Sequence, residues 1–391
     1  MRFPEFREEW EEHELSEYLD FKNGLNPKPN QFGKGIKFIS VMDILNNAVI
    51  TYDCIRASVS VSEEDMSAFS VQKGDILFQR SSETLEDVGR ANVYVDDIPA
   101  VFGGFVIRGK QKTNYNPLFF KYLLSSPLAR KRIIRMGAGA QHFNIGQEGL
   151  SKVKLPFACI DEQNKIAKIL YLLDKRISLQ NKIIEDLKKL QSAISKLLFA
   201  QKSNGWNRLD TLFSKGKAGG TPTSTNKEYY NGEIPFLSIN DITKQGKYVR
   251  CTENYLSQSG LENSSAWVVP KYSLIMSMYA SVGLVTINEM PLATSQAMFA
   301  MQLKDKNLLD YLYYYLSYFK YRHIHKYLET GTQSNINADI VRGIMIPTYG
   351  YRHNIEIAST LQGVDAKIGN ELSVLEQLHR QKNYFLSQMF I

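Results

Sequence analysis

The sequence repeats itself, and this internal repeat is the feature that most restricts the fold. Residues 38–44 (FISVMDI) recur as residues 236–242 (FLSINDI), an offset of 198. At the same offset, residues 73–78 (KGDILF) recur as residues 271–276 (KYSLIM). Self-similarity at a fixed spacing predicts copies of one structural module. We therefore expect two related modules in tandem.

The repeat continues to the end of the chain. Residues 155–199 match residues 346–390 without a gap, at an offset of 191. A length of 391 residues suits two domains, and a hydrophobic content of 43% lets each bury its own core. Each copy has the same internal order, a mixed segment followed by one long helical segment.

The mixed segments carry short strand signals and one aromatic helical stretch. The repeated motifs at 38–44 and 73–78 predict buried strands next to turns. Residues 117–136 and 308–329 are rich in aromatic and basic side chains and predict helices. Asn116 and Pro117 have the residue types of a helix cap and a first helical residue.

A heptad seam runs through the last segment of each copy and predicts two helices of about 36 residues, each about 54 Å long. Two polar residues interrupt each seam, Gln180 and Gln191 in the first copy and Glu371 and Lys382 in the second. An antiparallel coiled coil in which Gln180 faces Lys382 and Gln191 faces Glu371 would bring the polar layers together. The apolar seam positions are Ile166, Leu170, Leu173, Ile177, Ile184, Leu187, Ile357, Leu361, Val364, Ile368, Leu375 and Leu378.

These elements predict an α+β protein with two mixed α/β domains, separated by two long helices that pair as an antiparallel coiled coil about a pseudo-twofold axis. The expected boundaries are a first globular domain at 1–153, a central spacer helix at 154–203, a second globular domain at 204–344 and a C-terminal spacer helix at 345–391.

Charge and composition favour a polyanionic partner and a cytoplasmic location. The chain carries 47 Lys and Arg against 40 Asp and Glu, a net charge of +7, which suits phosphate binding. No apolar run reaches the roughly 18 residues of a membrane helix, so we expect no membrane association. The widely spaced Cys54, Cys159 and Cys251 do not form a disulfide framework, and we expect reduced thiols in the core.

Motifs for catalysis are missing from the sequence. Gly33 and Lys34 could end a phosphate-binding loop, but Lys28 stands where its first glycine is needed. The glycines of residues 101–105 are adjacent and no dinucleotide-binding pattern follows them. His323 and His325 lie two apart on a predicted helix and would point away from each other, which argues against a zinc site. We expect no catalytic residues, no bound metal and no cofactor on this chain.

The repeated motifs resemble those of the specificity subunit of type I restriction–modification systems. The resemblance rests on the tandem plan, on the two repeated strand motifs, and on Leu155-Pro156 followed by Asp161-Glu162-Gln163, Ile166-Ala167 and a long helix. Residues 219–222 (GGTP) also resemble the usual opening of a recognition domain in that family.

The two copies depart from the family pattern in different places. The first copy has residues 23–27 (NGLNP) where the second has its glycine pair. The second copy has His353-Asn354 in place of Glu162-Gln163. The resemblance therefore keeps the overall plan but allows the two halves to contact DNA and partners differently.

The resemblance implies a non-catalytic subunit. Its globular domains would be target recognition domains, each reading one half of an asymmetric bipartite sequence in double-stranded DNA. It would recruit two methylation subunits and two restriction subunits, and S-adenosylmethionine, ATP and magnesium would be bound only by these partners. Adenine N6 methylation and cleavage would belong to the complex, which is a phage defence.

Loops rich in amide, hydroxyl and basic side chains are the candidates for DNA contact, because these groups match base edges and phosphates. They follow the repeated strands, precede the long helices or lie in a polar turn. The candidates are Gln79, Arg80, Ser81, Gln141, His142, Asn144, Lys244, Lys247, Tyr279, Gln333, Ser334 and Asn335.

Two other classes of protein share some of these features. A coiled-coil interaction scaffold would have the same heptads but would not bind DNA in a salt-dependent way. An enzyme such as a methyltransferase or nuclease would turn over substrate as a pure protein, and the missing motifs argue against it.

Overall fold

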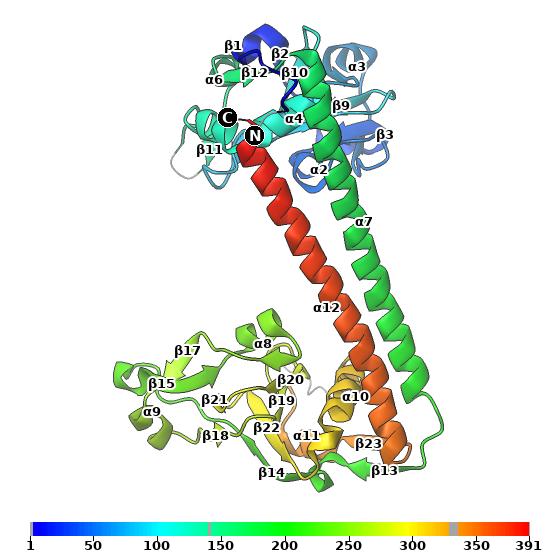
Figure 1. Ribbon diagram of the computed structural model, residues 1–391, viewed down its shortest axis with the longest axis vertical. Helices are drawn as coiled ribbons and strands as arrows, with labels where there is room; N and C mark the ends of the chain where they lie inside the picture. The colour runs from blue at the N-terminus through cyan, green and yellow to red at the C-terminus, as the bar shows by residue number, and fades with distance from the viewer. Residues whose placement is uncertain (1–2, 140–141, 328–334, 391) are drawn as a thin grey trace. The chain divides into compact units, whose positions relative to one another are not determined.

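The computed structural model describes residues 3–139, 142–327 and 335–390. Its contacts divide the chain into two units (Figure 1). Unit 1 contains residues 1–182 together with 372–391, and unit 2 contains residues 183–371. The long helices α7 (Ile160–Phe199) and α12 (Tyr351–Gln388) each contribute to both units.

Unit 1 is built on two four-stranded sheets and two strand pairs. The strands β3 and β9 run parallel, with Ile39 opposite Phe102, and the other pairs are antiparallel. The first sheet orders β2 (Leu19–Asn23), β10 (Val106–Gln111), β6 (Ile76–Gln79) and β8 (Ala91–Val93). The second orders β4 (Ser58–Val59), β3 (Phe32–Ile39), β9 (Ala100–Phe102) and β5 (Ser70–Val71). The pairs are β1 (Glu11–Glu14) with β12 (Lys154–Phe157) and β7 (Ser81–Ser82) with β11 (Phe143–Asn144).

Unit 2 repeats the strand order of both four-stranded sheets, as the sequence repeat predicts, and adds β16 (Tyr248–Val249) as a fifth strand to the first of them. Its parallel strands β15 and β21 place Leu237 opposite Thr294, the counterpart of Ile39 and Phe102. One sheet orders β14 (Phe213–Ala218), β22 (Met298–Leu303), β19 (Leu274–Ser277), β20 (Val285–Asn288) and β16 (Tyr248–Val249). The other orders β17 (Asn254–Leu256), β15 (Tyr230–Leu237), β21 (Leu292–Thr294) and β18 (Val268–Val269). The remaining pair is β13 (Gly205–Arg208) with β23 (Met345–Thr348).

The shorter helices connect these strands. In unit 1 they are α1 (Leu15–Tyr18), α2 (Val41–Asn46), α3 (Glu63–Phe69), α4 (Pro117–Ser125), α5 (Pro127–Ile134) and α6 (Gln147–Ser151). In unit 2 they are α8 (Ile239–Gln245), α9 (Gln258–Glu262), α10 (Leu309–Arg322) and α11 (Ala338–Gly343). Among the described residues, no helix is both long and apolar enough to cross a membrane.

The repeated FISVMDI motif forms the end of a strand and the first turn of a helix. In each unit a serine hydroxyl and a nearby aspartate carboxylate make a reciprocal cap, Ser40 with Asp43 and Ser238 with Asp241. Such a capping box satisfies backbone N–H groups that a helix start leaves free. The predicted turn is therefore a short helix in both copies.

The helix predicted over residues 117–136 is two helices. It begins as expected, because the Asn116 side chain accepts hydrogen bonds from the backbone N–H groups of Leu118 and Phe119. Pro127 then interrupts it, since proline has no N–H group for the helical ladder, and Ser126 caps α5. The equivalent α10 has no proline and runs unbroken to Arg322.

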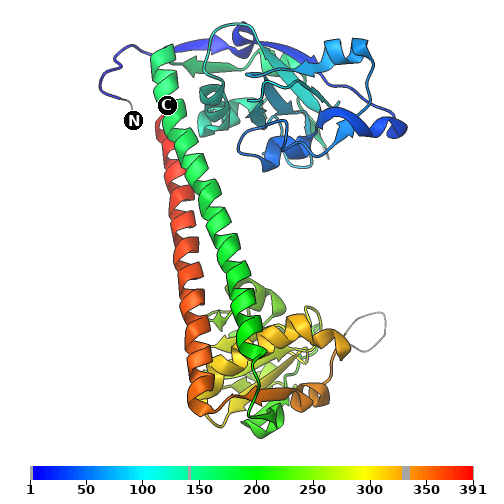
Figure 2. The same cartoon turned by 90° about the vertical axis from the view of Figure 1, so that its right-hand side faces the viewer.

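Each long helix packs into the core of both units. In unit 1, Ile166 and Leu170 of α7 join the core formed by the first sheet and α4, and so do Met389 and Phe390 near the end of the chain. Figures 1 and 2 show α7 and α12 lying side by side in this unit. In unit 2, Leu361 of α12 joins the core around α10.

The predicted seam positions lie on the packed faces of the two helices. All of the twelve are buried or half-buried. Leu173, Ile177 and Leu378 form a cluster of their own between the helices of unit 1. Other seam residues belong to the cores of the two units, Ile166 and Leu170 in unit 1 and Ile357 and Leu361 in unit 2.

The pairing is antiparallel, but its register differs from the one predicted. Lys382 contacts Asp174 in unit 1, with 2.6 Å between Nζ and Oδ1, and in unit 2 Gln191 donates to Asp365. Asp174 and Gln191 are 17 positions apart on α7, and their partners Lys382 and Asp365 are 17 positions apart on α12 in the opposite direction. Both contacts therefore belong to the same antiparallel register. Lys382 and Gln191 thus contact aspartates that lie beside the seam.

The cysteines are free, but they are not core residues. Cys54 is half-buried, and Cys159 and Cys251 are exposed. The expectation of core thiols is wrong because two of these positions lie at chain segments that the sheets leave open to solvent.

Candidate nucleic-acid interface

In unit 1 the structure brings together two of the predicted DNA-contacting segments. The short strands β7 and β11 pair Ser81 with Asn144, and the Ser81 hydroxyl donates to the Asn144 side chain. The backbone N–H of Ile145 also donates to the carbonyl of Arg80, at 2.9 Å. Segments about 60 positions apart in sequence therefore form one polar surface.

The predicted residues on this surface have different exposures. Gln79 is only 5% exposed and its side chain donates to the carbonyl of Ser81. It therefore stabilises the loop from the buried side and does not face solvent. Arg80 is half-buried and its guanidinium donates to the carbonyl of Gly104 at 3.3 Å. His142 and Asn144 are exposed. Gln141 lies outside the described residues.

Unit 2 repeats the contact between the two loops. The backbone N–H of Ile336 donates to the carbonyl of Met278 at 3.1 Å, the counterpart of Ile145 and Arg80. Tyr279 is 41% exposed at the tip of its loop, and Asn335 beside Ile336 is half-buried. The other two candidates of this segment, Gln333 and Ser334, lie outside the described residues.

The loop that carries Tyr279 has a strained backbone. Ala280 and Ser281 have φ values of 40° and 47°, in the left-handed region that non-glycine residues seldom adopt. The hydroxyl of Ser277 holds this turn by donating to the carbonyl of Ser281 and accepting from the N–H of Leu284. Strain of this kind persists only where surrounding contacts fix it. Tyr279 is thus presented on a defined turn.

The two predicted lysines of unit 2 differ in their surroundings. Lys244 is exposed on α8 and pairs with Glu253. The Lys247 ammonium lies 2.6 Å from the Asp310 carboxylate and 3.0 Å from the Tyr314 hydroxyl, with its side chain 12% exposed. Lys247 is therefore held inside the unit, whereas Lys244 can reach solvent.

The glycine-containing segments that differ between the copies occupy the same place in the fold. Gly24 and Leu25 donate their N–H groups to the carbonyls of Val106 and Phe102. Gly219 and Gly220 make the same bonds to Met298 and Thr294. The approach is close, because a Cβ at Gly24 would lie 2.1 Å from the Gly103 oxygen and one at Gly219 would lie 1.9 Å from the Thr294 oxygen. The departure at 23–27 thus changes the side chains and keeps the backbone path.

Sequence reasoning missed an apolar hollow that lies beside Ser81. It has a volume of about 420 Å³ and is formed by residues 25–27, 40–42 and 103–106 together with Phe32, Phe38 and Ser81. Phe105 is 68% exposed and Met42 is 61% exposed at its surface. The sequence analysis had marked residues 23–27 and 38–44, Ser81 and the adjacent glycines 103 and 104 for other reasons, and none of them indicated an apolar surface.

A buried carboxylate joins the globular part of unit 1 to its helices. Asp174 of α7 accepts from the Tyr122 hydroxyl at 2.9 Å and contacts the ammonium groups of Lys121 and Lys382 at 3.3 and 2.6 Å. Burial alone would raise the pKa of Asp174, but the two ammonium groups outweigh it and the pKa is lowered. Burial lowers the pKa of Lys121 to about 8.

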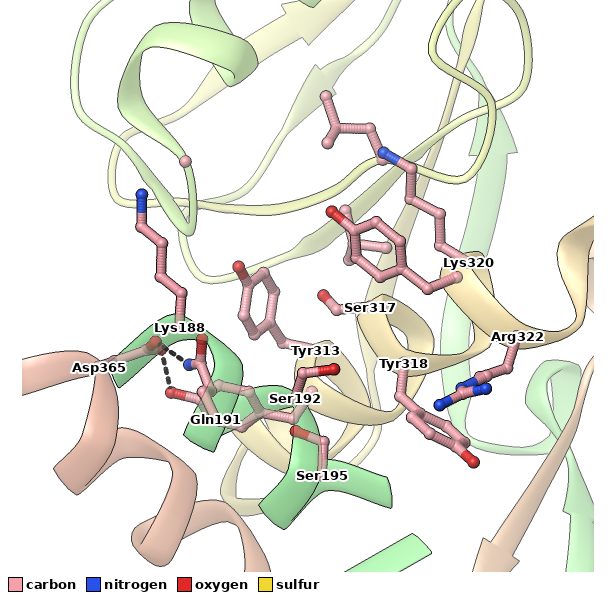
Figure 3. Close-up of a pocket in the computed structure, with 15 residues that line it drawn as sticks. Lys188, Gln191, Ser192, Ser195, Tyr313, Ser317, Tyr318, Lys320, Arg322 and Asp365 are labelled. Carbon is pink, nitrogen blue, oxygen red and sulfur yellow. Dashed lines mark hydrogen bonds between the residues drawn. The ribbon is translucent and has the colours of Figure 1, made fainter. Parts of the chain in front are cut away.

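The counterpart in unit 2 is Asp365, and its partners are neutral. It accepts from the amide of Gln191 and from the hydroxyl of Tyr314 (Figure 3). A cavity of about 480 Å³ lies beside it, between the C-terminal part of α7 and α10. Tyr313, Ser317, Lys320 and the other labelled side chains of Figure 3 line this cavity.

The departure from Glu162-Gln163 to His353-Asn354 also changes a contact. In unit 1 Gln163 accepts from the N–H of Asn116 at 2.9 Å, which ties α7 to the start of α4. In unit 2 Asn354 accepts from the N–H of Tyr349, so its contact stays at the start of its own helix.

Comparisons with known proteins agree with this architecture. The family model described as the type I restriction modification DNA specificity domain matches residues 7–189 and again residues 204–380. A Methanocaldococcus jannaschii protein provisionally named the type I restriction enzyme MjaX specificity subunit is 25% identical, over 98% of this chain and 93% of its own. The Haemophilus influenzae HindI specificity subunit is 32% identical over 111 residues, which are 28% of this chain and 24% of its own.

Two solved structures share the fold. One is the S subunit of a type I restriction–modification system from M. genitalium, with a TM-score of 0.59 at 15% identity, over 98% of this chain and 96% of that one. The other comes from a study of complex assembly and conformational transition of the type I R-M system, with a TM-score of 0.61 at 16% identity, over 97% and 96%. The matched family model covers both units, so the chain belongs to the type I restriction–modification specificity family and is a non-catalytic subunit that recognises DNA sequence.

Proposed function

We infer that each unit reads one part of a bipartite, asymmetric target in double-stranded DNA. The observation that carries this proposal is that the two units repeat one scaffold and expose different side chains at its loops. The loop position that holds the half-buried Ser81 in unit 1 holds the exposed Tyr279 in unit 2, whereas Asn144 and Asn335 are the same residue type at equivalent positions. Different side chains on equivalent loops favour different base sequences.

The chain would act within a larger complex. We propose that it recruits methylation and restriction subunits, as the assembly named for one structural relative suggests. Two copies of each partner would match the two repeated units. S-adenosylmethionine, ATP and magnesium would be held by those subunits, and the complex would work in the cytoplasm.

The test is to co-express this chain with the methylation subunit of its own system and to map N6-methyladenine across the host genome. The expected result is one motif of two short defined parts separated by a fixed gap. The matched control replaces the globular segment of unit 2, residues 204–344, by that of another specificity subunit. This exchange should change one part of the motif and leave the other part intact.

Two outcomes would contradict the proposal. If a stable complex forms and no adenine is methylated, and if the complex does not bind DNA in a salt-dependent way, the chain is an interaction scaffold. If the domain exchange changes both parts of the motif together, the units do not read separate parts of the target.

A further inference from the structure

The apolar hollow of unit 1 exposes large side chains that the fold does not need. Phe105, Met42 and Phe32 are 68%, 61% and 43% exposed, and all three line the same hollow. Contiguous exposed apolar groups on a protein surface mark a binding site more often than scattered ones do. These side chains are therefore candidates for contact with a partner.

The hollow is continuous with the polar surface of unit 1. Ser81 lines the hollow and also pairs with Asn144 of β11. The guanidinium of Arg80 donates to the carbonyl of Gly104, which lies in the wall of the hollow. A molecule that contacts Ser81 and Asn144 would therefore also cover Phe105 and its neighbours.

Two lysines lie close in sequence to residues of the hollow. Lys28 directly follows Pro27 of the wall, and Lys34 lies on β3 two positions after Phe32. Both lysines are exposed. An apolar patch between cations and amide or hydroxyl groups suits the edge of a base pair, which lies between two phosphate chains.

Unit 2 lacks two of these three large apolar side chains at the equivalent positions, and Tyr230 stands where unit 1 has Phe32. Asn240 stands where unit 1 has Met42, and Ala297 stands where it has Phe105. The amide of Asn240 donates to Glu253 at 3.0 Å. The scaffold is thus the same in both units, and the exposed apolar side chains at positions 42 and 105 have no counterpart in unit 2.

We propose that the hollow of unit 1 receives the 5-methyl group of a thymine in the part of the target that unit 1 reads. Among the groups that base pairs present in the major groove, this methyl group is the apolar one. Met42 and Phe105 surround it, and Ser81 and Asn144 contact polar atoms beside it. This inference rests on the proposed reading of DNA by unit 1 and adds the chemistry of one position.

The test uses the complex with its methylation subunit and synthetic duplexes that carry the mapped motif. Each thymine of the unit 1 half-site is replaced in turn by deoxyuridine, which lacks only the methyl group. At one position the affinity should fall about three- to fivefold, the effect of one methyl group removed from an apolar contact. Uridine in the other half-site is the internal control.

Two variants assign the effect to the hollow. Met42→Asn and Phe105→Ala introduce the residues of unit 2, and both positions are exposed enough to keep the fold. In these variants thymine and uridine duplexes should bind alike. Ile98→Ala is the control, because Ile98 is 52% exposed and lies away from the hollow residues, and this variant should still distinguish the two duplexes.

Several outcomes would overturn the inference without affecting the proposed function. One is a unit 1 half-site in which uridine binds as well as thymine at every position. Another is that Phe105→Ala weakens assembly with the methylation subunit and leaves the uridine effect unchanged, in which case the hollow binds protein. Complete absence of DNA binding by the wild-type complex would remove the proposed function and the inference with it.

Discussion

The two units fix their long helices at equivalent aspartates, but with different chemistry. Asp174 of unit 1 lies between two ammonium groups and a tyrosine hydroxyl, whereas Asp365 of unit 2 accepts from an amide and a tyrosine hydroxyl. One of the two ammonium groups belongs to Lys121 of α4, which also donates to the carbonyl of Ala48. One scaffold therefore tolerates, at the same place, a carboxylate with two cationic partners and a carboxylate whose direct partners are neutral.

This difference has a physical consequence. Buried ion pairs gain little net stability, because desolvation offsets the attraction, but the loss of one partner leaves an uncompensated charge. Hydrogen bonds from neutral donors to a carboxylate are less costly to lose, because their loss leaves no unpaired cation. Unit 1 should therefore depend on its aspartate more strongly than unit 2 does.

The largest expected effect comes from replacing these aspartates. Asp174→Asn leaves two ammonium groups without their carboxylate and should destabilise unit 1 by about 3–5 kcal/mol. Asp365→Asn should destabilise unit 2 by about 1–2 kcal/mol. Hydrogen exchange of peptides from α4 and α10 reports on each unit separately. Equal losses in the two variants would show that the charged and neutral networks are equivalent.

Substitutions in the paired loops should affect different parts of the DNA target in the two units. Arg80→Ala should relax one position of the part read by unit 1, and Tyr279→Ala one position of the other part. Each should cost about 1–3 kcal/mol in binding to the native motif. The measurement is a binding series with single base changes. Lys73→Ala, on the exposed turn before β6, serves as the control, and relaxation of the same position by both loop variants would refute this assignment.

A smaller difference between the two units is expected in how their stability depends on alkaline pH. The pKa of Lys121 is about 8 in the folded protein and near 10.5 when unfolded, so the unfolded state binds more protons between these values. The stability of unit 1 should therefore rise from pH 8 to pH 10, by at most about 1.4 kcal/mol per pH unit. Hydrogen exchange of α4, corrected for the intrinsic rate, measures this. Lys121→Met should remove the rise, and a rise that persists in this variant would assign it to another group.

The smallest effect should come from the exposed lysine of unit 2. Lys244→Ala should weaken binding to all sequences alike, about two- to fivefold, and reduce the salt dependence by about one phosphate contact. Lys247→Ala should leave the salt dependence unchanged, because Asp310 and Tyr314 already hold its ammonium group. Titrations at several salt concentrations compare the two. A reduced salt slope for Lys247→Ala would mean that this lysine leaves its pocket to contact DNA.

Much of the fold could be predicted because the repeat and the heptads are periodic. Two modules with the same strand order follow from the repeat, and the seam follows from apolar positions such as Leu173 and Ile177. The register could not be predicted, because Asp174 and Asp365 lie beside the seam and are fixed by Tyr122 and Tyr314 of the globular parts. Heptad spacing carries no information about such tertiary contacts.

The same limit applies to the candidate interface. Polar runs next to repeated strands led to the prediction that the loops around Ser81 and Asn144 contact DNA, and the structure brings these two loops together. The hollow could not be found in this way, because its wall combines segments near residues 25, 40 and 105 that are far apart in sequence. A surface built from distant segments has no local pattern.

The contacts of Phe390 have a consequence for biosynthesis. Its ring packs against Trp10 and Phe119, so the core of the unit that begins the chain is closed by residues near position 390. During translation the core of unit 1 stays incomplete, and this apolar surface stays exposed, until the end of α12 and Phe390 have left the ribosome. A premature stop codon shortly before residue 386 would thus damage the core of unit 1, which is translated first. The core of unit 2, which is translated later, would stay intact.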